Sequence, residues 1–370
     1  MPHPSKLFTP ITLGGITLPN RIVVSPMCQY SAQDGRMTDW HLQHLGQYAC
    51  SGAGLFMVEA TGVTPDGRIT HACTGLYDDA TERAMAKALA VYRGITKHPV
   101  GIQLAHAGRK ASTHPPFAGG KPLAAGESPW QTAAPSAIPF GEGWHVPHEL
   151  SISELKTLIQ KFVDSADRAR RLGFDAVELH SAHGYLLHQF LSPLSNQRKD
   201  EYGRDRMKFP LEVAAAVRAV WPKERCLGAR ISASDWMEGG AAPDDAVAYA
   251  RELDRLGFDY VCVSSGALVP QARIPVSPGY QVAFAAKVKK ETDIAVRAVG
   301  LIVRAEQAEE IVSSGQADMV ALARGFLDDP RWVWHAAEHF GVRAEIPPQY
   351  ARTRPDQWPG AQYARPRETA

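Results

Sequence analysis

The chain of 370 residues is 45% hydrophobic and 21% charged, a composition typical of a soluble globular protein. Its formal net charge of +1 gives no electrostatic argument for a nucleic acid or an anionic membrane surface as partner. No apolar run reaches the length of a membrane span and no signal-peptide core follows Met1, so we expect a cytoplasmic protein. The five cysteines form no Cys-x-x-Cys pair, which argues against a zinc, iron–sulfur or disulfide framework.

Eight short apolar segments alternate with segments of helical periodicity along the chain. The apolar segments are nearly continuous, as expected of parallel strands that are buried on both faces. The predicted strands are 22–27, 54–60, 100–105, 176–180, 226–232, 260–264, 294–299 and 319–323. The predicted helices include 79–96, 151–172, 243–256 and 304–314.

An internal repeat supports this alternation. Arg-Leu-Gly-Phe-Asp at 171–175 recurs at 255–259, and Ser-Gly-Gln-Ala-Asp at 314–318 is a weaker copy. Each indicates a helix end, a glycine cap, a turn and a strand. Eight such units predict an α/β fold, a (β/α)8 TIM barrel. A doubly wound open sheet is the alternative, but no Gly-x-Gly-x-x-Gly follows the first strand.

Three segments stand outside the repeat of this single domain, which we expect to span the whole chain, 1–370, with its barrel at about 7–340. Residues 7–20, with Gly14-Gly15 at the centre, predict an N-terminal hairpin that closes the bottom of the barrel. Residues 108–149 are rich in Pro, Gly and Trp and predict an excursion over the catalytic face after strand three. The polar, Pro- and Arg-rich residues 341–370 predict a C-terminal arm that is either disordered or docked.

Chemistry in this fold sits at the C-terminal ends of the strands. At the end of the fourth predicted strand, His180 and His183 are followed by Tyr185. If a helical turn begins there, the two imidazoles share a face and can point at one ligand atom, with the phenol beside them. On the basis of these three residues alone, a pair of structural histidines at a strand end is an equally good interpretation.

Other strand ends carry residues suited to a planar cofactor. Gly300 follows strand seven, and Ala323, Arg324 and Gly325 follow strand eight, an arrangement typical of the phosphate site of this fold. Gln103 and Arg230 suit the polar edge of a heterocycle, because a buried arginine needs an electron-rich partner. Each residue alone is better explained as a satisfied core polar group, but their joint positions favour FMN.

Several motifs together resemble the old yellow enzyme family of FMN-dependent ene reductases, close to its thermophilic-like or xenobiotic-reductase class. The resemblance extends from about residue 7 to residue 352. The matching stretches are 20–22, 25–30, 103–110, 134–136, 178–190 and 200–203.

The resemblance implies an NAD(P)H-dependent enzyme that reduces the activated C=C bond of α,β-unsaturated aldehydes, ketones, maleimides or nitroalkenes. FMN is the expected cofactor, and NADPH or NADH the co-substrate. The substrate's activating oxygen would bind His180 and His183, flavin N5 would give hydride, and Tyr185 would give the proton. The residues implied around the flavin are Ser25, Pro26, Met27, Cys28, Ala60, Gln103, His180, His183 and Arg230, with Gly300, Ala323 and Arg324 at its phosphate.

Two further positions match this class of the family. Tyr30 is expected near the substrate oxygen. Arg352 matches an arginine that reaches a neighbouring subunit's site, which implies a homodimer or higher homo-oligomer acting on small molecules. One departure is the stretch 200–209, which is shorter than the family pattern and has Asp205 where the family has Asn. The resemblance therefore does not predict the loop structure and the helix start in this stretch, near the rim of the site.

Two rival interpretations are open. A metal-dependent barrel hydrolase could use His106, His180 and His183 as ligands, but such sites usually add carboxylates or a His-x-His on the first strand, which here offers Ser-Pro-Met-Cys. We expect no metal. A non-catalytic flavin-binding protein is the second rival, against which Tyr185 beside the histidine pair argues.

Overall fold

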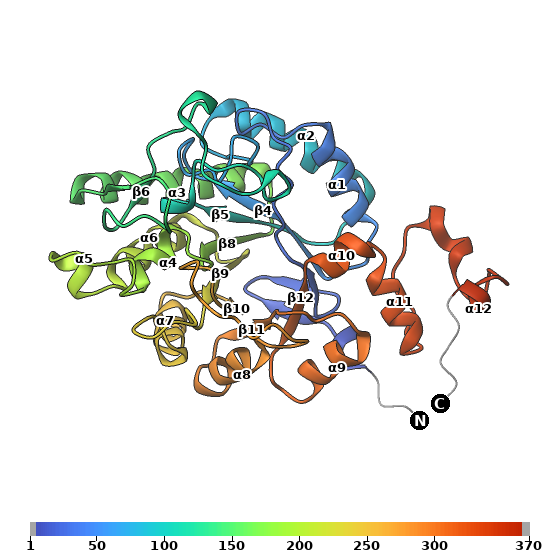
Figure 1. The fold of residues 1–370 in the computed structure, drawn as a ribbon. Helices are drawn as coiled ribbons and strands as arrows, with labels where there is room; N and C mark the ends of the chain where they lie inside the picture. The colour runs from blue at the N-terminus through green and yellow to red at the C-terminus, as the bar shows by residue number, and fades with distance from the viewer. Residues whose placement is uncertain (1–4, 365–370) are drawn as a thin grey trace.

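The computed structural model describes residues 5–364, and its centre is a closed barrel of eight parallel strands surrounded by helices (Figure 1). The strands pair in the order β3-β4-β5-β8-β9-β10-β11-β12, with β12 closing onto β3. They are β3 (Ile22–Val24), β4 (Leu55–Gly62), β5 (Val100–Ala105), β8 (Ala176–Ser181), β9 (Cys226–Ser232), β10 (Tyr260–Ser264), β11 (Ala295–Ala298) and β12 (Met319–Leu322). The predicted TIM barrel is confirmed.

Most of the α-helices lie outside the barrel and cover its strands (Figure 1). They are α1 (Asp39–Ala49), α2 (Asp79–Ile95), α3 (Ile152–Leu172), α4 (Leu186–Leu191), α5 (Glu201–Arg204), α6 (Lys208–Val220), α7 (Pro243–Arg255), α8 (Val282–Glu291), α9 (Ala305–Ser313), α10 (Arg324–Asp328), α11 (Trp332–His339) and α12 (Ala361–Ala364). The four predicted helices correspond to α2, α3, α7 and α9. Their ends differ from the prediction by no more than one residue at each terminus.

The first barrel strand is shorter than predicted. β3 ends at Val24, although the apolar run continues to Met27. Ser25 still donates its backbone N–H to the carbonyl of Leu322 at 2.9 Å. Pro26 has no N–H to continue the ladder, so the chain leaves the barrel there.

The repeated glycines end their helices or turns in the left-handed conformation. Gly173, Gly257 and Gly315 have φ angles of 83°, 81° and 79°. A side chain disfavours this region and glycine does not, so the repeat reflects one turn used three times. At its other end, α3 begins at Ser151, whose hydroxyl accepts the backbone N–H of Glu154.

The N-terminal hairpin closes one end of the barrel, as predicted. β1 (Ile11–Leu13) and β2 (Ile16–Leu18) pair in antiparallel fashion, with Leu13 opposite Ile16. Leu13 and Leu18 are buried in one cluster with Val23, Leu55 and other inward-facing strand residues. This apolar plug removes water from the bottom of the barrel and leaves the opposite end for a site.

Charged and polar side chains fill the middle of the barrel. Glu178 accepts hydrogen bonds from Arg297, from the hydroxyl of Tyr260 and from the amide of Gln103. Arg297 and Glu178 are both inaccessible to solvent. An unpaired buried charge would strongly destabilise the fold, so the ion pair between Arg297 and Glu178 is what allows charged groups in the barrel interior.

The excursion after β5 is anchored to the C-terminal face of the barrel. It contains three short 3-10 helices, and β6 (Ala133–Ala134) pairs with β7 (His148–Glu149) in parallel. The buried Arg109 donates to the carbonyl of Leu268 at 2.9 Å and to that of Ile138 at 3.2 Å. One guanidinium therefore ties the excursion to the loop after β10.

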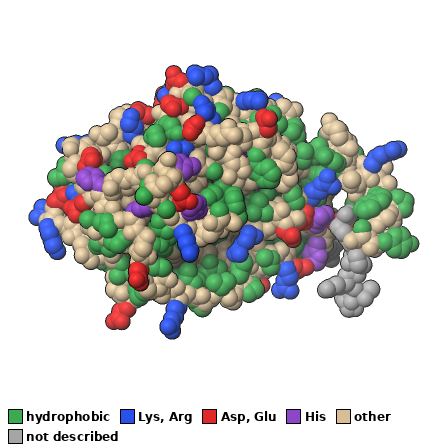
Figure 2. Space-filling view, turned by 45° about the horizontal axis from the view of Figure 1, so that its top comes forward, with side chains coloured by type: hydrophobic (Ala, Val, Ile, Leu, Met, Phe, Trp, Pro, Cys, Tyr) green, Lys and Arg blue, Asp and Glu red, His purple; other side chains and the backbone are tan. Residues whose placement is uncertain are grey.

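The C-terminal arm lies to the side of the barrel (Figures 1 and 2). After α11 it forms a 3-10 turn at Pro348–Thr353 and the short α12, and its last residues, 365–370, lie outside the described part. Positive and negative side chains are interspersed on the face in Figure 2. Within residues 5–364, no helix is long and apolar enough to cross a membrane.

Candidate active site

His180 lies near the C-terminal end of β8 as a neutral hydrogen-bond donor. Its Nδ1 accepts the backbone N–H of Ala182 at 3.2 Å, so the ring proton is on Nε2. The residue is buried, with 4% of its surface exposed. Burial, followed by the charge of Arg230, lowers the pKa of His180 well below its usual value. At neutral pH this imidazole can give a hydrogen bond without carrying a charge.

His183 reaches the same space by a turn that the sequence did not predict. Its φ of 57° is left-handed, and α4 begins only at Leu186, so the two imidazoles are not brought together by a helical turn. The rings of His180 and His183 are nevertheless 5.1 Å apart and nearly perpendicular, at 83°. His183 Nε2 lies 2.7 Å from the hydroxyl of Ser264, which donates to Gln281. His183 is therefore the donor to Ser264, and its Nε2 proton is already engaged.

Tyr185 stands just before α4 and completes the triplet. Its ring centroid is 4.9 Å from that of His180, with an interplanar angle of 85°. Desolvating surroundings raise the pKa of Tyr185 well above its usual value, so it stays protonated across the neutral range. The ammonium of Lys110 lies 5.0 Å from the centre of the Tyr185 ring and donates to the carbonyls of His183 and Ala267, both at 2.8 Å. Burial, with the charge of Arg109, lowers the pKa of Lys110 to about 7.

A cavity of about 330 Å³ opens at the C-terminal ends of the strands, and of the triplet His183 lines it whereas His180 and Tyr185 do not. The predicted site residues that line it are Ser25, His183, Arg230, Gly300, Ala323 and Arg324. Its other lining residues include Ser264, Gln281, Tyr280 and Ile274. The fold thus brings together Arg230 of β9 and residues that follow β3, β8, β11 and β12, which are distant in sequence.

Two features of this cavity fit FMN. Nε of Arg230 is buried and has no hydrogen-bond partner within residues 5–364, so it needs an acceptor from a ligand. Gly300 has a φ of 113°, and a Cβ there would lie 2.8 Å from the amide nitrogen of Gln281. Only glycine allows the backbone this path beside the cavity. Flavin mononucleotide has a polar ring edge that can accept a hydrogen bond from Arg230. It also has a phosphate that the backbone at Gly300 can approach closely.

The other predicted flavin contacts are His180 on β8 and residues around β3, β4 and β5, and all lie outside the lining of this cavity. Ala60 on β4 is opposite Gln103 on β5. Gln103 uses its amide N–H on Glu178 at 2.7 Å. A hydrogen bond with Cys73, followed by burial, raises the pKa of Cys28 well above its usual value, so this thiol is protonated at neutral pH. The prediction that they contact flavin stays a prediction.

Tyr30 lies close to the excursion, because its ring packs edge-on against Phe117 at 6.1 Å. It adopts a left-handed φ of 49°. Burial raises its pKa, which keeps its phenol protonated. Its predicted contact with the substrate oxygen stays a prediction.

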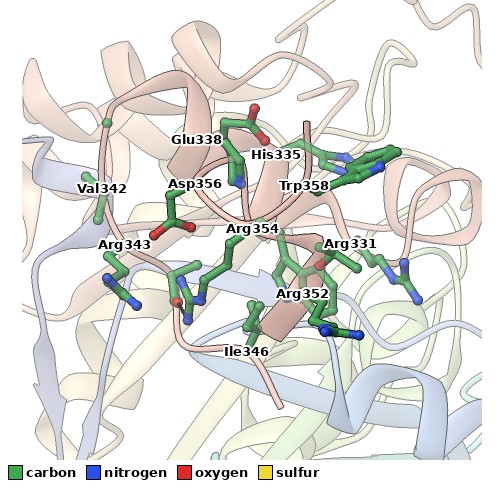
Figure 3. A pocket seen from close by; sticks show the side chains of 15 residues that line it. Arg331, His335, Glu338, Val342, Arg343, Ile346, Arg352, Arg354, Asp356 and Trp358 are labelled. Carbon is green, nitrogen blue, oxygen red and sulfur yellow. Dashed lines mark hydrogen bonds between the residues drawn. The ribbon is translucent and has the colours of Figure 1, made fainter. Parts of the chain in front are cut away.

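Arg352 lies in the C-terminal arm, away from the triplet of the same chain. It lines a second cavity of about 590 Å³ with residues of α11 and of the arm (Figure 3). Arg331, Arg343 and Arg354 line the same cavity. Arg331 lies over the rings of Trp334 and Tyr350, which ties the arm to α11.

Sequence reasoning missed several residues that support the triplet. Ser264 and Gln281 engage His183, and Lys110 ties two loops together. Lys110 lies in the stretch 103–110, which resembles the family, but its contacts join loops that are distant in sequence. His188 and Asp235 form a buried pair at 3.0 Å that no spacing in the sequence suggests, because they are brought together only by the fold.

Comparison with known proteins gives one consistent result. Residues 6–342 match the model of the NADH:flavin oxidoreductase / NADH oxidase family. An NADPH dehydrogenase of Geobacillus thermodenitrificans is 45% identical over 94% of this chain and 98% of its own length. One from Bacillus licheniformis is 44% identical with the same coverage of both chains. The structure of morphinone reductase superposes with a TM-score of 0.75 and 28% identity, covering 94% of this chain and 92% of that one.

A 2-naphthoyl-CoA reductase has the same fold, with a TM-score of 0.81 at 21% identity over 90% of this chain and 52% of that one. The matched family covers nearly the whole barrel, and the cavity at the strand ends fits its cofactor. The chain therefore belongs to the NADH:flavin oxidoreductase / NADH oxidase family, the old yellow enzyme family of FMN-dependent oxidoreductases that use a reduced nicotinamide nucleotide.

Proposed function

We propose that this oxidoreductase is an ene reductase that reduces the activated C=C bond of α,β-unsaturated aldehydes, ketones, maleimides or nitroalkenes. The observation that carries the proposal is the pairing of a neutral donor with a phenol. Within the described residues, Nε2 of His180 has no hydrogen-bond partner, and the Tyr185 ring lies 4.9 Å from the His180 ring. A carbonyl or nitro oxygen and the carbon next to the activating group could occupy the space that these two side chains share.

The histidines would stabilise negative charge on the substrate oxygen. Because burial keeps His180 and His183 neutral, they polarise this oxygen without protonating it. Preorganised donors of this kind act where charge develops in the transition state. His180 would give the first hydrogen bond, and His183 would join it by exchanging Ser264 for the substrate.

Tyr185 would supply the proton to the substrate's α-carbon. A raised pKa keeps the phenol protonated, and an enolate carbon is basic enough to take its proton. The position of Lys110, 5.0 Å from the centre of the ring, would favour the phenolate that remains. Bound FMN would supply the redox chemistry, by taking hydride from NAD(P)H and passing it to the substrate's β-carbon.

Several residues would hold FMN. Arg230 would donate from its unpartnered Nε to the polar edge of the flavin ring. Backbone groups at Gly300, Ala323 and Arg324, with the guanidinium of Arg324, would hold the phosphate. Ser25, Pro26, Met27, Cys28, Ala60 and Gln103 would complete the walls around the flavin.

The assembly we propose is a homodimer or a higher homo-oligomer in the cytoplasm. Arg352 lies in the arm rather than beside the triplet of its own chain, so it could contact substrate only in a neighbouring subunit. Tyr30 would line the same substrate space from its own chain.

The test is an anaerobic stopped-flow measurement in two halves. NADPH or NADH should bleach the bound flavin, and 2-cyclohexenone should then restore its absorbance far faster than cyclohexanone, the matched saturated ketone. Equal, slow reoxidation by both ketones would refute ene reduction and favour a non-catalytic flavoprotein. A metal-dependent hydrolase finds no support in residues 5–364, which hold no group of three or more His, Cys, Asp or Glu arranged to bind a metal ion.

A further inference from the structure

Behind the triplet, a buried histidine and aspartate contact the backbone between His183 and Tyr185. The backbone N–H of Gly184 donates to Nδ1 of His188 at 2.8 Å. Nε2 of His188 lies 3.0 Å from Oδ1 of Asp235. The two atoms are within ion-pair distance, but neither makes a hydrogen bond of regular geometry to any group in residues 5–364. The side chains of His188 and Asp235 are 1% and 0% exposed, so no bulk water replaces these contacts.

These contacts fix which nitrogen of His188 carries the proton. Nδ1 accepts a backbone N–H and must be unprotonated, so Nε2 carries the proton and faces the carboxylate of Asp235 at 3.0 Å. The other oxygen of Asp235 is also committed, because it accepts from the hydroxyl of Ser192 at 2.6 Å and from the backbone N–H of Ala241 at 2.7 Å. Burial acts to raise the pKa of Asp235, but the nearby His188, with the hydrogen bonds from Ser192 and Ala241, holds it below its usual range.

Gly184 is the point at which this pair acts on the triplet. It has a φ of 72°, and a Cβ there would lie 2.3 Å from the carbonyl oxygen of Ala267. The backbone is thus clamped between the loop after β10 on one side and His188 on the other. His183 and Tyr185 are its two chain neighbours, so a shift of Gly184 moves both.

We propose that Asp235 and His188 are positioning residues for the active site. Asp235 holds His188 in the tautomer that accepts the N–H of Gly184, and that contact fixes the neighbouring His183 and Tyr185. The inference rests on the proposed function, since it matters through the roles of those two residues. Neither Asp235 nor His188 lines the cavity at the strand ends that His183 lines.

The replacement Asp235→Asn tests the tautomer directly. Its oxygen would stay with Ser192 and Ala241, so its amide N–H would face Nε2 of His188. His188 would then move its proton to Nδ1, where it opposes the N–H of Gly184. A displacement of about 1 Å in a catalytic group costs up to about a hundredfold in rate, which is the loss we expect in alkene reduction by the FMN-loaded variant.

The replacement His188→Asn supplies the decisive comparison. Its Oδ1 takes the place of Nδ1 and can still accept from Gly184, whatever residue 235 is. The double variant should therefore be more active than Asp235→Asn alone, although it loses more packing and melts at a lower temperature. Ser192→Ala is the matched control, since it removes a hydrogen bond from Asp235 without touching His188, and it should keep nearly full activity.

Three readouts separate the possibilities. The ring ¹⁵N shifts of His188, identified by their loss in His188→Asn, should show Nε2 protonated in the parent protein and Nδ1 protonated in Asp235→Asn. The concentration of 4-hydroxybenzaldehyde that gives half of the charge-transfer band with oxidised flavin should be higher in Asp235→Asn than in the parent protein. In the double variant it should be lower than in Asp235→Asn. Alkene reduction should follow the same order.

If the ¹⁵N shifts showed His188 of the parent protein to be protonated on Nδ1, the inference would be wrong, whatever the activities of the variants. Additive losses in the double variant, or a Ser192→Ala variant as impaired as Asp235→Asn, would reduce the pair to a packing role. If the parent protein did not reduce alkenes at all, the proposed function would fail, but the ¹⁵N shifts and the phenol titration would still decide on the tautomer.

Discussion

The rings of His180 and Tyr185 stand almost perpendicular, with their centroids 4.9 Å apart. One side chain offers an unused N–H from the end of β8, and the other offers a hydroxyl from the start of α4. The two donors come from opposite ends of the six-residue stretch 180–185, whose middle is held by other parts of the fold. A substrate between them would meet a hydrogen-bond donor and a proton source at fixed separation.

The two histidines should differ in importance. His180 Nε2 is free to meet the substrate, whereas His183 Nε2 is already engaged with Ser264. His180→Asn should therefore slow alkene reduction on the order of a hundredfold, as loss of an oxyanion donor does. His183→Asn should cost less. Single-turnover rates of alkene reduction check this, and equal losses would show that both donors act alike.

Arg230 should control the affinity for FMN. Removal of a charged donor from a buried contact costs about 2–5 kcal/mol, so Arg230→Met should weaken FMN binding on the order of a hundredfold. Titration of the apoprotein with FMN, followed by flavin fluorescence, measures the change. Arg251→Met, on the outer surface of α7, is the control. Unchanged affinity in Arg230→Met would remove Arg230 from the cofactor site.

His44 should make stability fall in acid. Burial, followed by the charge of His41, lowers the pKa of His44 to about 4. Between pH 4 and 6.5 the unfolded chain binds a proton on His44 that the folded chain does not. The free energy of unfolding is therefore highest above pH 6.5, as far as His44 is concerned, and it decreases as the pH falls towards 4. The change is on the order of 3 kcal/mol. Urea unfolding of the parent and of His44→Gln across this range should give a flatter pH dependence in the variant, and equal slopes would contradict this.

The C-terminal arm should matter for substrate affinity and not for flavin reduction. Arg352→Ala, or truncation after Pro347, should raise the KM for the alkene if Arg352 reaches a neighbouring subunit. Arg343→Ala changes another arginine of the same cavity and should leave KM unchanged. Light scattering should give at least a dimer for the parent protein. A monomer whose KM survives truncation would remove the arm from the site.

The barrel could be predicted because its signals are local. Each strand is a continuous apolar run, and glycines such as Gly173 and Gly257 mark turns that a side chain would strain. The end of β3 was missed because Pro26 stops the ladder inside an apolar run. The parallel pair of β6 and β7 was also missed, because two-residue strands carry no periodicity.

The candidate site was predictable only in part, for a physical reason. His180, His183 and Tyr185 are neighbours in sequence, and so their cluster is visible there. The left-handed turn at His183 was not, because a histidine carries no signal for positive φ. Asp235 lies far along the chain from His188, and only the closure of the barrel brings the two within 3.0 Å.

The central claim is that Tyr185 gives the proton in alkene reduction, and the variant Tyr185→Phe tests it most directly. Stopped-flow spectroscopy would follow flavin reduction by NADPH and flavin reoxidation by 2-cyclohexenone in separate experiments. We predict a nearly unchanged first rate and a strongly reduced second rate, with a nitroalkene affected least because its nitronate can leave before it is protonated. A variant that slows both half-reactions equally, or neither, would contradict the assignment.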